Sequence, residues 1–229
     1  MHLLAISPHL DDAVFSAGAT LWERAQAGDR VTILTCFTGN VARPQGFALA
    51  CQLDKGLPAE VDYMALRRAE DEAACAVLGA AAVHLPLLEA PHRGYVSAAA
   101  LFGERLAEDR IAGPLREALA EQLDRLRPDR MLGPYGVGAH VDHLYVRDVL
   151  TELVEPARLA WWEDYPYAMR EAEPPPEITR RAVSEVALAA KVEATLCYTT
   201  QLAFQFGGAE KARRAMAAWR HEGSARATV

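Results

Sequence analysis

Short apolar runs alternate with amphipathic helical stretches along most of the chain, and this alternation limits the folds that the sequence can adopt. It predicts an α/β protein whose mostly parallel sheet is covered by helices on both faces. Because crossovers between parallel strands are right-handed, we expect a Rossmann-like three-layer sandwich with strand order 3-2-1-4-5. The expected strands cover residues 3–7, 31–37, 82–85, 130–133 and 159–162, and the expected helices cover residues 11–27, 63–78, 113–126, 141–154, 183–200 and 209–220.

Length and composition indicate one domain. The chain has 229 residues, of which 51% are hydrophobic, and this is enough to bury a substantial core. We therefore expect a single domain over residues 1–229, with a C-terminal helical portion from about residue 177 packed on it. The connections 38–62 and 86–108 are long for an α/β domain, and long connections often act as lids or binding loops.

Charge and hydropathy exclude several classes of partner. The formal net charge is -7, and no basic stripe with interleaved aromatic residues is present, so we expect no nucleic-acid partner. No apolar stretch approaches the ~20 residues that a membrane-spanning helix needs. The first residues lack the basic region of a signal peptide, and the four cysteines show no CxxC spacing. These features favour a cytoplasmic enzyme with reduced thiols.

Histidine and aspartate residues gather directly after two of the expected strands. Ser7–Ala13 (SPHLDDA) follows the first strand, and Gly136–His143 (GVGAHVDH) follows the fourth. In an open parallel sheet, ligand sites form at the carboxyl ends of the strands, where the strand order reverses. With strand order 3-2-1-4-5, the first and fourth strands are neighbours at this point. The two segments should therefore face each other.

The residue types in these two segments suit a metal ion. Two imidazoles and one carboxylate, with water at the open positions, form an ordinary catalytic zinc site. Such a metal lowers the pKa of its water toward ~7 and polarises a carbonyl group, as amide hydrolysis requires. Taken alone, a His-x-x-Asp turn is more often a helix cap or an ion pair. Two such segments at the ends of neighbouring strands favour a metal site instead.

The same segments resemble known sequence motifs. Pro8–Ala13 (PHLDDA) is similar to the PHPDDE motif, and His140–His143 (HVDH) is similar to the HxDH motif, of the PIG-L/LmbE-like zinc deacetylases. The two metal motifs are specific as a pair, and the resemblance covers about residues 1–205. Further segments that resemble the family follow in the expected order: Arg67-x-x-Glu70, then Ala74 and Leu78-Gly79, Glu163–Tyr167 (EDYPY), and Tyr198-x-x-Gln201.

The resemblance implies a zinc-dependent hydrolase that removes an N-acyl group, expected to be acetyl, from an amino sugar or a glycoside containing N-acetylglucosamine. It implies that His9, Asp12 and His143 bind the metal. The ion is Zn2+ or, in the cell, Fe2+, because two histidines and one aspartate suit both. The partner is then a small acylated amino sugar or glycoside. Neither the aglycone nor assembly into a homo-oligomer can be read from the residues.

The resemblance also implies catalytic roles for three residues. Asp11 would be the general base that accepts a proton from the metal-bound water. His140 would polarise the substrate carbonyl or stabilise its oxyanion, and Asp142 would hold the imidazole of His140 in orientation. Two positions depart from the motif, because Leu10 replaces a proline and Ala13 replaces a glutamate. The second change removes a carboxylate from the first helical turn without altering the three ligands.

Four further residues are candidates for substrate binding. Arg67 either contacts a substrate hydroxyl or phosphate, or forms an internal ion pair with Glu70 or another acid. Asp164 follows the fifth strand on the ligand side of the sheet, where we expect it to contact a substrate hydroxyl. His92 and Arg93 belong to the long connection 86–108, and we expect them to line the pocket.

Other functions fit the fold but agree less well with the residues. A dinucleotide-dependent oxidoreductase or a methyltransferase needs a glycine-rich turn after the first strand, and here this turn is Pro8–Asp12. A non-catalytic scaffold would not need both histidine-containing segments, and the metal content would distinguish it from an enzyme. A metal-dependent phosphoesterase often binds two metals, and the sequence offers no second set of ligands. An altered family member that acts on another acyl amide stays as the alternative.

Overall fold

The computed structural model describes residues 1–171 and 173–227 as a seven-stranded sheet covered by helices. The strands are β1 (His2–Ser7), β2 (Arg30–Thr35), β3 (Ala81–His84), β4 (Arg130–Pro134), β5 (Leu159–Trp162), β6 (Thr179–Ala182) and β7 (His221–Arg226). Their order in the sheet is β3-β2-β1-β4-β5-β7-β6. The first five are parallel, and β7 is antiparallel to both β5 and β6. The predicted order 3-2-1-4-5 is thus confirmed, and two more strands extend the sheet.

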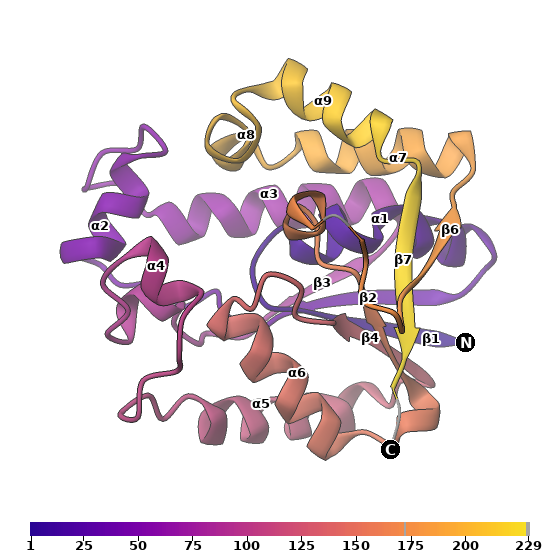
Figure 1. Ribbon diagram of the computed structural model, residues 1–229, viewed down its shortest axis with the longest axis horizontal. Helices are drawn as coiled ribbons and strands as arrows, with labels where there is room; N and C mark the ends of the chain where they lie inside the picture. Colours follow the sequence, from indigo (N-terminus) through magenta and orange to yellow (C-terminus); the bar gives the residue numbers. More distant parts are fainter. Residues whose placement is uncertain (172, 228–229) are drawn as a thin grey trace.

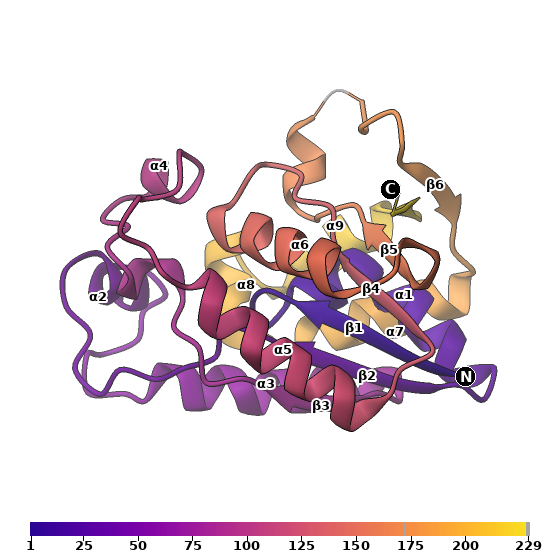
Figure 2. The same ribbon diagram turned by 90° about the horizontal axis from the view of Figure 1, so that it is seen from below.

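Helices cover both faces of the sheet, as Figures 1 and 2 show. One face carries α5 (Ala112–Leu126) and α6 (Val141–Leu153). The other carries α1 (Asp12–Gln26) and α3 (Tyr63–Leu78), and α7 (Glu185–Leu196) packs on these two helices. The predicted three-layer α/β sandwich is therefore confirmed. The remaining helices, outside these layers, are α2 (Gly46–Leu53), α4 (Ala98–Leu101), α8 (Thr199–Phe206) and α9 (Ala209–Ala218).

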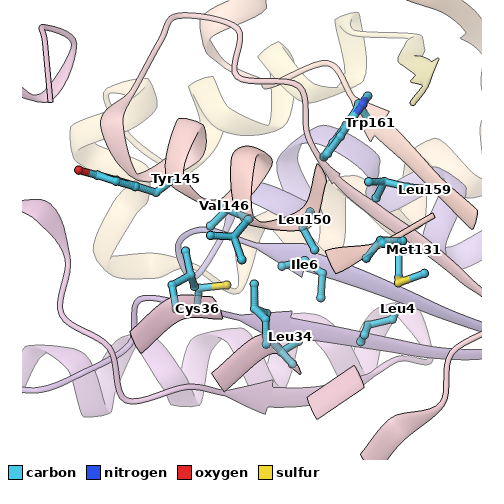
Figure 3. Close-up of a cluster of buried hydrophobic side chains, with 14 of the residues drawn as sticks. Leu4, Ile6, Leu34, Cys36, Met131, Tyr145, Val146, Leu150, Leu159 and Trp161 are labelled. Atoms are coloured by element: carbon cyan, nitrogen blue, oxygen red, sulfur yellow. The ribbon is translucent and has the colours of Figure 1, made fainter. Parts of the chain in front are cut away.

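Alternate residues of β1 belong to the cores on the two faces of the sheet. Leu4 and Ile6 pack into the cluster beneath α5 and α6, whereas Leu3 and Ala5 pack into the cluster beneath α1 and α3. Figure 3 shows the first of these clusters, which includes Leu150 of α6. A parallel strand that is buried on both faces has a continuous apolar sequence, as β1 does. Burial on both sides fixes β1 and thereby the start of the loop that follows it.

The C-terminal part departs from the prediction in two ways. The predicted helix 183–200 is two helices, because Glu70 of α3 accepts hydrogen bonds from the Thr199 hydroxyl at 2.5 Å and the Thr200 amide at 2.8 Å. These bonds satisfy groups in the first turn of α8, which therefore begins anew after α7. In addition, β6 and β7 were not predicted, since their sequences TRRA and HEGSAR contain no apolar alternation. The expected helical portion from residue 177 is helical only in part.

The two long connections follow the carboxyl ends of β2 and β3. The first contains α2 and the second contains α4. Both views place α2 and α4 at the same end of the molecule (Figures 1 and 2). None of the helices in residues 1–171 and 173–227 combines the length and the hydropathy required to cross a bilayer.

Candidate active site

The loops after β1 and β4 meet at the carboxyl edge of the sheet. The two strands are adjacent and parallel, with Ala5 opposite Leu132, so the chain leaves both on the same side. The ring centroid of His9, after β1, lies 5.0 Å from that of His140 and 5.4 Å from that of His143, both after β4. The structure therefore brings together the two segments that the strand order places side by side.

Three potential metal ligands converge in this cluster. Asp12 Oδ2 lies 3.1 Å from His9 Nδ1 and 3.2 Å from His143 Nε2. Ligand atoms of the three residues all lie within 4.8 Å of one another. His143 is fully buried, yet its Nε2 makes no hydrogen bond with any residue that the structure describes. Because a buried polar atom without a partner is costly, and because imidazole and carboxylate suit divalent metals, these residues fit a metal ion.

A second carboxylate supports each of the two histidines. Asp142 Oδ2 lies 3.0 Å from His9 Nε2, and Asp164 Oδ1 lies 2.8 Å from His143 Nδ1. In both rings, the supporting carboxylate contacts the nitrogen that does not face Asp12. Histidines that bind metals commonly donate their other N–H group to a carboxylate, which fixes the orientation of the ring and raises its basicity.

The electrostatics of the cluster favour positive charge at its centre. Burial opposes protonation of His143, but Asp12 and Asp164 outweigh it and raise the pKa of this ring to about 9. Burial likewise opposes a charge on His9, yet Asp12 and Asp142 raise the pKa of its imidazole well above the ordinary value. Burial also opposes the charge of Asp12, but the two imidazoles hold the pKa of its carboxyl well below the usual range. A bound cation would experience the same negative field.

The side chain of Asp11 contacts Arg67 rather than the two histidines, although Asp11 is adjacent to Asp12. Its backbone has a φ of 148°, a value that residues other than glycine rarely adopt, and this turns the two carboxylates apart. Asp11 Oδ2 lies 3.6 Å from Arg67 Nη2 and lines a cavity. Burial raises the pKa of the Asp11 carboxyl to about 7, although Arg67 opposes this rise. Such a carboxyl can accept and release a proton near neutral pH.

His140 presents one defined tautomer to the cavity. As the N-cap of α6, its Nδ1 accepts a hydrogen bond from the backbone N–H of Asp142 at 3.2 Å. Because a backbone amide can only donate, the neutral ring carries its proton on Nε2. Burial, assisted by the charge on His9, lowers the pKa of His140 to about 3 and keeps the ring neutral. The ring lines the cavity and can therefore donate a hydrogen bond to a ligand.

The prediction that the Asp142 carboxylate orients His140 is wrong. Besides His9, this carboxylate accepts hydrogen bonds from the Ala90 amide at 3.0 Å and from Arg93 Nη2 at 2.6 Å. The contact with His140 is made by the Asp142 backbone instead, because His140 is the N-cap of α6 and Asp142 belongs to its first turn. His9, His140 and Asp142 form a second set of potential ligands within 4.8 Å. Because the Asp142 carboxylate already accepts these hydrogen bonds, it is less available to a metal ion. The set formed by His9, Asp12 and His143 is therefore the better candidate.

The prediction that Asp164 contacts a substrate hydroxyl is also wrong. Asp164 is fully buried and does not line the cavity. In addition to His143, its carboxylate accepts hydrogen bonds from the backbone N–H groups of Gly136 at 2.7 Å and Val137 at 2.9 Å. Asp164 therefore connects the end of β5 to the loop after β4, and it positions His143.

Arg93 has a similar supporting position instead of the predicted one in the pocket. Its guanidinium bonds to Asp142 on one side and to Asp109, at 3.1 Å, on the other. It is buried and lies over the ring of Phe37, 5.1 Å from the centroid. The physical reason is that Asp142 and Asp109 are both buried carboxylates, which require a cation between them.

Arg67 and His92 line the cavity, which is the position predicted for His92, and substrate contact by either residue stays a prediction. Arg67 also forms an internal ion pair, with Glu89 at 2.6 Å rather than with Glu70, and it donates to the backbone oxygen of Leu10 at 3.0 Å. Burial lowers the pKa of His92. Sequence reasoning missed Glu89, because a single acid in a long connection gives no signal of its partner.

The cavity has a volume of about 370 Å³, with the metal site and Asp11 at its inner end. Tyr167, which sequence reasoning assigned no role, packs with its ring 5.5 Å from that of His143. A Cβ atom on Gly138 would lie 2.8 Å from the Cβ of Tyr167, and Gly138 has a φ of 81°. The loop after β4 therefore requires glycine where it passes this wall of the cavity.

Fold and site together define a Rossmann-like α/β protein with a candidate His2Asp metal centre at the switch point of its sheet. A family model described as PIG-L, GlcNAc-PI de-N-acetylase, matches residues 4–154. The chain belongs to the PIG-L family.

Three proteins that are similar to this chain are named as deacetylases. It is 33% identical over 169 residues to 2'-N-acetylparomamine deacetylase of Streptomyces fradiae, a match that covers 72% of this chain and 57% of the relative. The chain thus spans little more than half of that relative. A zinc-inhibited form of teicoplanin deacetylase Orf2 is similar with a TM-score of 0.82 at 26% identity, over 98% of this chain and 97% of the other. The A40926 pseudoaglycone deacetylase Dbv21 is similar with a TM-score of 0.79 at 31% identity, over 99% of this chain and 98% of the other.

Proposed function

We propose that this chain is a metal-dependent hydrolase that removes the acetyl group from an N-acetylated amino sugar. One observation carries most of the weight: within the described part of the chain, His143 Nε2 is buried, makes no hydrogen bond, and lies 3.2 Å from Asp12 Oδ2 and close to His9. The family model, 2'-N-acetylparomamine deacetylase, Orf2 and Dbv21 support the reaction type, because each of these is named for deacetylation. The cytoplasmic location stays a prediction from the sequence.

His9, Asp12 and His143 would hold the metal, for which we propose Zn2+, with Fe2+ as the alternative in the cell. When bound, the metal supplies Lewis acidity toward the acetamide carbonyl and lowers the pKa of a water molecule. Asp142 and Asp164 would keep the two imidazoles oriented, since each contacts the ring nitrogen that does not face Asp12.

Two residues on the cavity surface would act on the reacting groups. Asp11 would accept a proton from the attacking water, because its carboxyl has a pKa of about 7 and lines the cavity. His140 would donate a hydrogen bond from its Nε2–H to the carbonyl oxygen as negative charge develops there, and it would keep this proton. The proton held by Asp11 would then pass to the sugar nitrogen. The C–N bond would break, leaving acetic acid and the amine, which become acetate and an ammonium group by transfer of the remaining proton.

Acetate release from methyl N-acetylglucosaminide, compared before and after metal loading, tests this proposal. The protein is stripped with a chelator and reloaded with one equivalent of Zn2+ or Fe2+. We expect acetate only from the reloaded protein. Asp11→Asn should keep its metal but lower kcat by ~100-fold or more, because it cannot accept the proton. Asp124→Asn, which alters a highly exposed side chain on α5, is the matched control.

Three outcomes would contradict these assignments. A fully loaded protein that releases no acetate from this glycoside or from aryl N-acetylglucosaminides would exclude the proposed reaction. Turnover by Asp11→Asn at the rate of the unaltered protein would exclude Asp11 as the base. Failure to bind any metal would favour the non-catalytic scaffold.

A further inference from the structure

The outer half of the cavity is built by segments that contribute no candidate metal ligand. They are α2 with the loop after it, α4, α8 and the 3-10 turn Tyr167–Arg170. Figures 1 and 2 place α2 and α4 at the same end of the molecule. The side chains of these segments, rather than the metal ligands, would contact whatever is attached to the amino sugar.

Large apolar side chains in this outer half remain exposed. Phe204 of α8 is 56% exposed, and Phe102, after α4, is 39% exposed. Phe47 of α2 and Leu101 of α4 also line the cavity. Exposed aromatic side chains that converge on a cavity indicate that its ligand has an apolar surface.

Lys55 is a cation among these rings that has no acidic partner within residues 1–171 and 173–227. Its Nζ lies 4.4 Å from the ring centroid of Phe204 and 5.5 Å from that of Tyr63. It donates one hydrogen bond, of 2.9 Å, to the backbone oxygen of Cys51. An ammonium group has three N–H donors, so Lys55 retains donors for an anionic group. Cation–π contacts with the Phe204 and Tyr63 rings hold the Lys55 ammonium group at the cavity wall.

Charges around the cavity are distributed unevenly. Arg170 also lines the outer half and forms no ion pair with the residues that the structure describes. In the same part of the chain, the carboxylates that line the cavity are Asp11, Asp12 and Glu89. The first two belong to the inner end, and Glu89 is already ion-paired. An ammonium group on the aglycone would therefore meet like charges, whereas a carboxylate or phosphate would find two cations.

We propose that the outer cavity selects N-acetylated amino sugars whose aglycone is apolar and carries an anionic group, and that Lys55 recognises that anion. Phe204 and Phe102 contact the apolar part of the aglycone. The inference rests on the deacetylase function proposed above, and it adds the substrate class that this site prefers.

Four glycosides of N-acetylglucosamine test the inference on the metal-loaded protein. They are the methyl, phenyl, 4-carboxyphenyl and 4-(aminomethyl)phenyl glycosides, each as both anomers, and kcat/KM is measured from acetate release. We expect kcat/KM to be about tenfold higher for the carboxyphenyl than for the phenyl compound, because one charge-assisted hydrogen bond is added. The aminomethylphenyl compound should have the lowest kcat/KM of the three aryl glycosides.

Variants of Lys55 test whether the preference for the carboxyphenyl over the phenyl glycoside depends on this residue. Lys55→Gln should bring the ratio between the carboxyphenyl and phenyl compounds to about one, whereas Lys55→Arg should keep most of it. Lys211→Gln removes the same charge from an exposed position on α9 outside the cavity, and it should keep the ratio of the unaltered protein.

The possible failures are distinguishable. Equal kcat/KM for the three aryl glycosides, or an unchanged ratio in Lys55→Gln, would overturn the inference and leave the deacetylase function intact. Acetate release from none of the four glycosides would overturn the deacetylase function and the inference with it.

Discussion

The carboxylate of Asp164 lies 2.8 Å from Nδ1 of His143, and Nε2 of the same ring faces Asp12. Asp164 is held in turn by the backbone N–H groups of Gly136 and Val137. A residue at the end of β5 thus fixes a ring in α6. It determines which nitrogen of His143 is free to bind a metal.

Replacing this carboxylate should weaken metal binding. We expect Asp164→Asn to lower the affinity for Zn2+ by ~10-fold to 100-fold, because the ring loses its orientation and part of its basicity. Competition with a chromophoric chelator measures the affinity. Asp71→Asn is the matched control, since Asp71 is a buried carboxylate bonded to Tyr198 and His84 and does not line the cavity. Equal Zn2+ affinities in the two variants would contradict the role of Asp164.

Arg93 should affect stability rather than substrate binding. Arg93→Met leaves the buried Asp109 carboxylate without its cation and removes one of the two cationic partners of Asp142, and we expect it to lower the free energy of unfolding by about 3–5 kcal/mol. Urea unfolding of the metal-free protein measures this change. Arg116→Met, which removes an exposed ion pair with Glu152, should cost about 0–1 kcal/mol. Unchanged stability of Arg93→Met together with a raised KM would restore the original prediction of a substrate contact.

His140 should matter for turnover and not for metal content. We expect His140→Ala to lower kcat by ~100-fold to 1000-fold, because it removes the hydrogen-bond donor at the carbonyl oxygen. Metal analysis of the purified variant should still find the same stoichiometry. Loss of metal from His140→Ala would instead favour the second set of potential ligands, which includes His140 and Asp142.

Metal binding should release protons near neutral pH. In the metal-free protein the pKa of His143 is about 9 and that of His9 is also raised, so both rings are protonated at pH 7. A metal ion must displace these protons, and its apparent affinity should therefore rise as the pH increases toward 9 and fall at lower pH. Titration calorimetry at pH 7 in buffers of different ionisation enthalpy should detect about one to two protons released per ion. An affinity that does not change with pH would contradict these ionisation states.

The strands that could be predicted are those that consist of short apolar runs. The strands β1 to β5 appear in the sequence as short apolar runs, and their alternation with helices sets their order. The strand β6 forms one edge of the sheet and β7 lies between β5 and β6, and here backbone pairing is sufficient without an apolar pattern in the side chains. Their sequences are mostly charged or small, so the sequence carries no sign of them.

Some features of the candidate site could be predicted from the sequence, and others could not. The meeting of His9, Asp12 and His143 follows from strand order, because both loops leave adjacent parallel strands on one side. The partners of Asp142 and Asp164 could not be predicted, because they depend on which nitrogen of each ring faces inward. The N-cap of α6 and the buried amides after β4 decide this, and neither is visible in residue spacing.

Locating the metal in crystals of the reconstituted, active protein tests the central claim most directly. Anomalous scattering at the zinc edge should show one ion per chain, at about 2.0–2.2 Å from ligand atoms of His9, Asp12 and His143. Active crystals in which these three side chains surround no ion, or in which the ion is bound elsewhere, would contradict the claim.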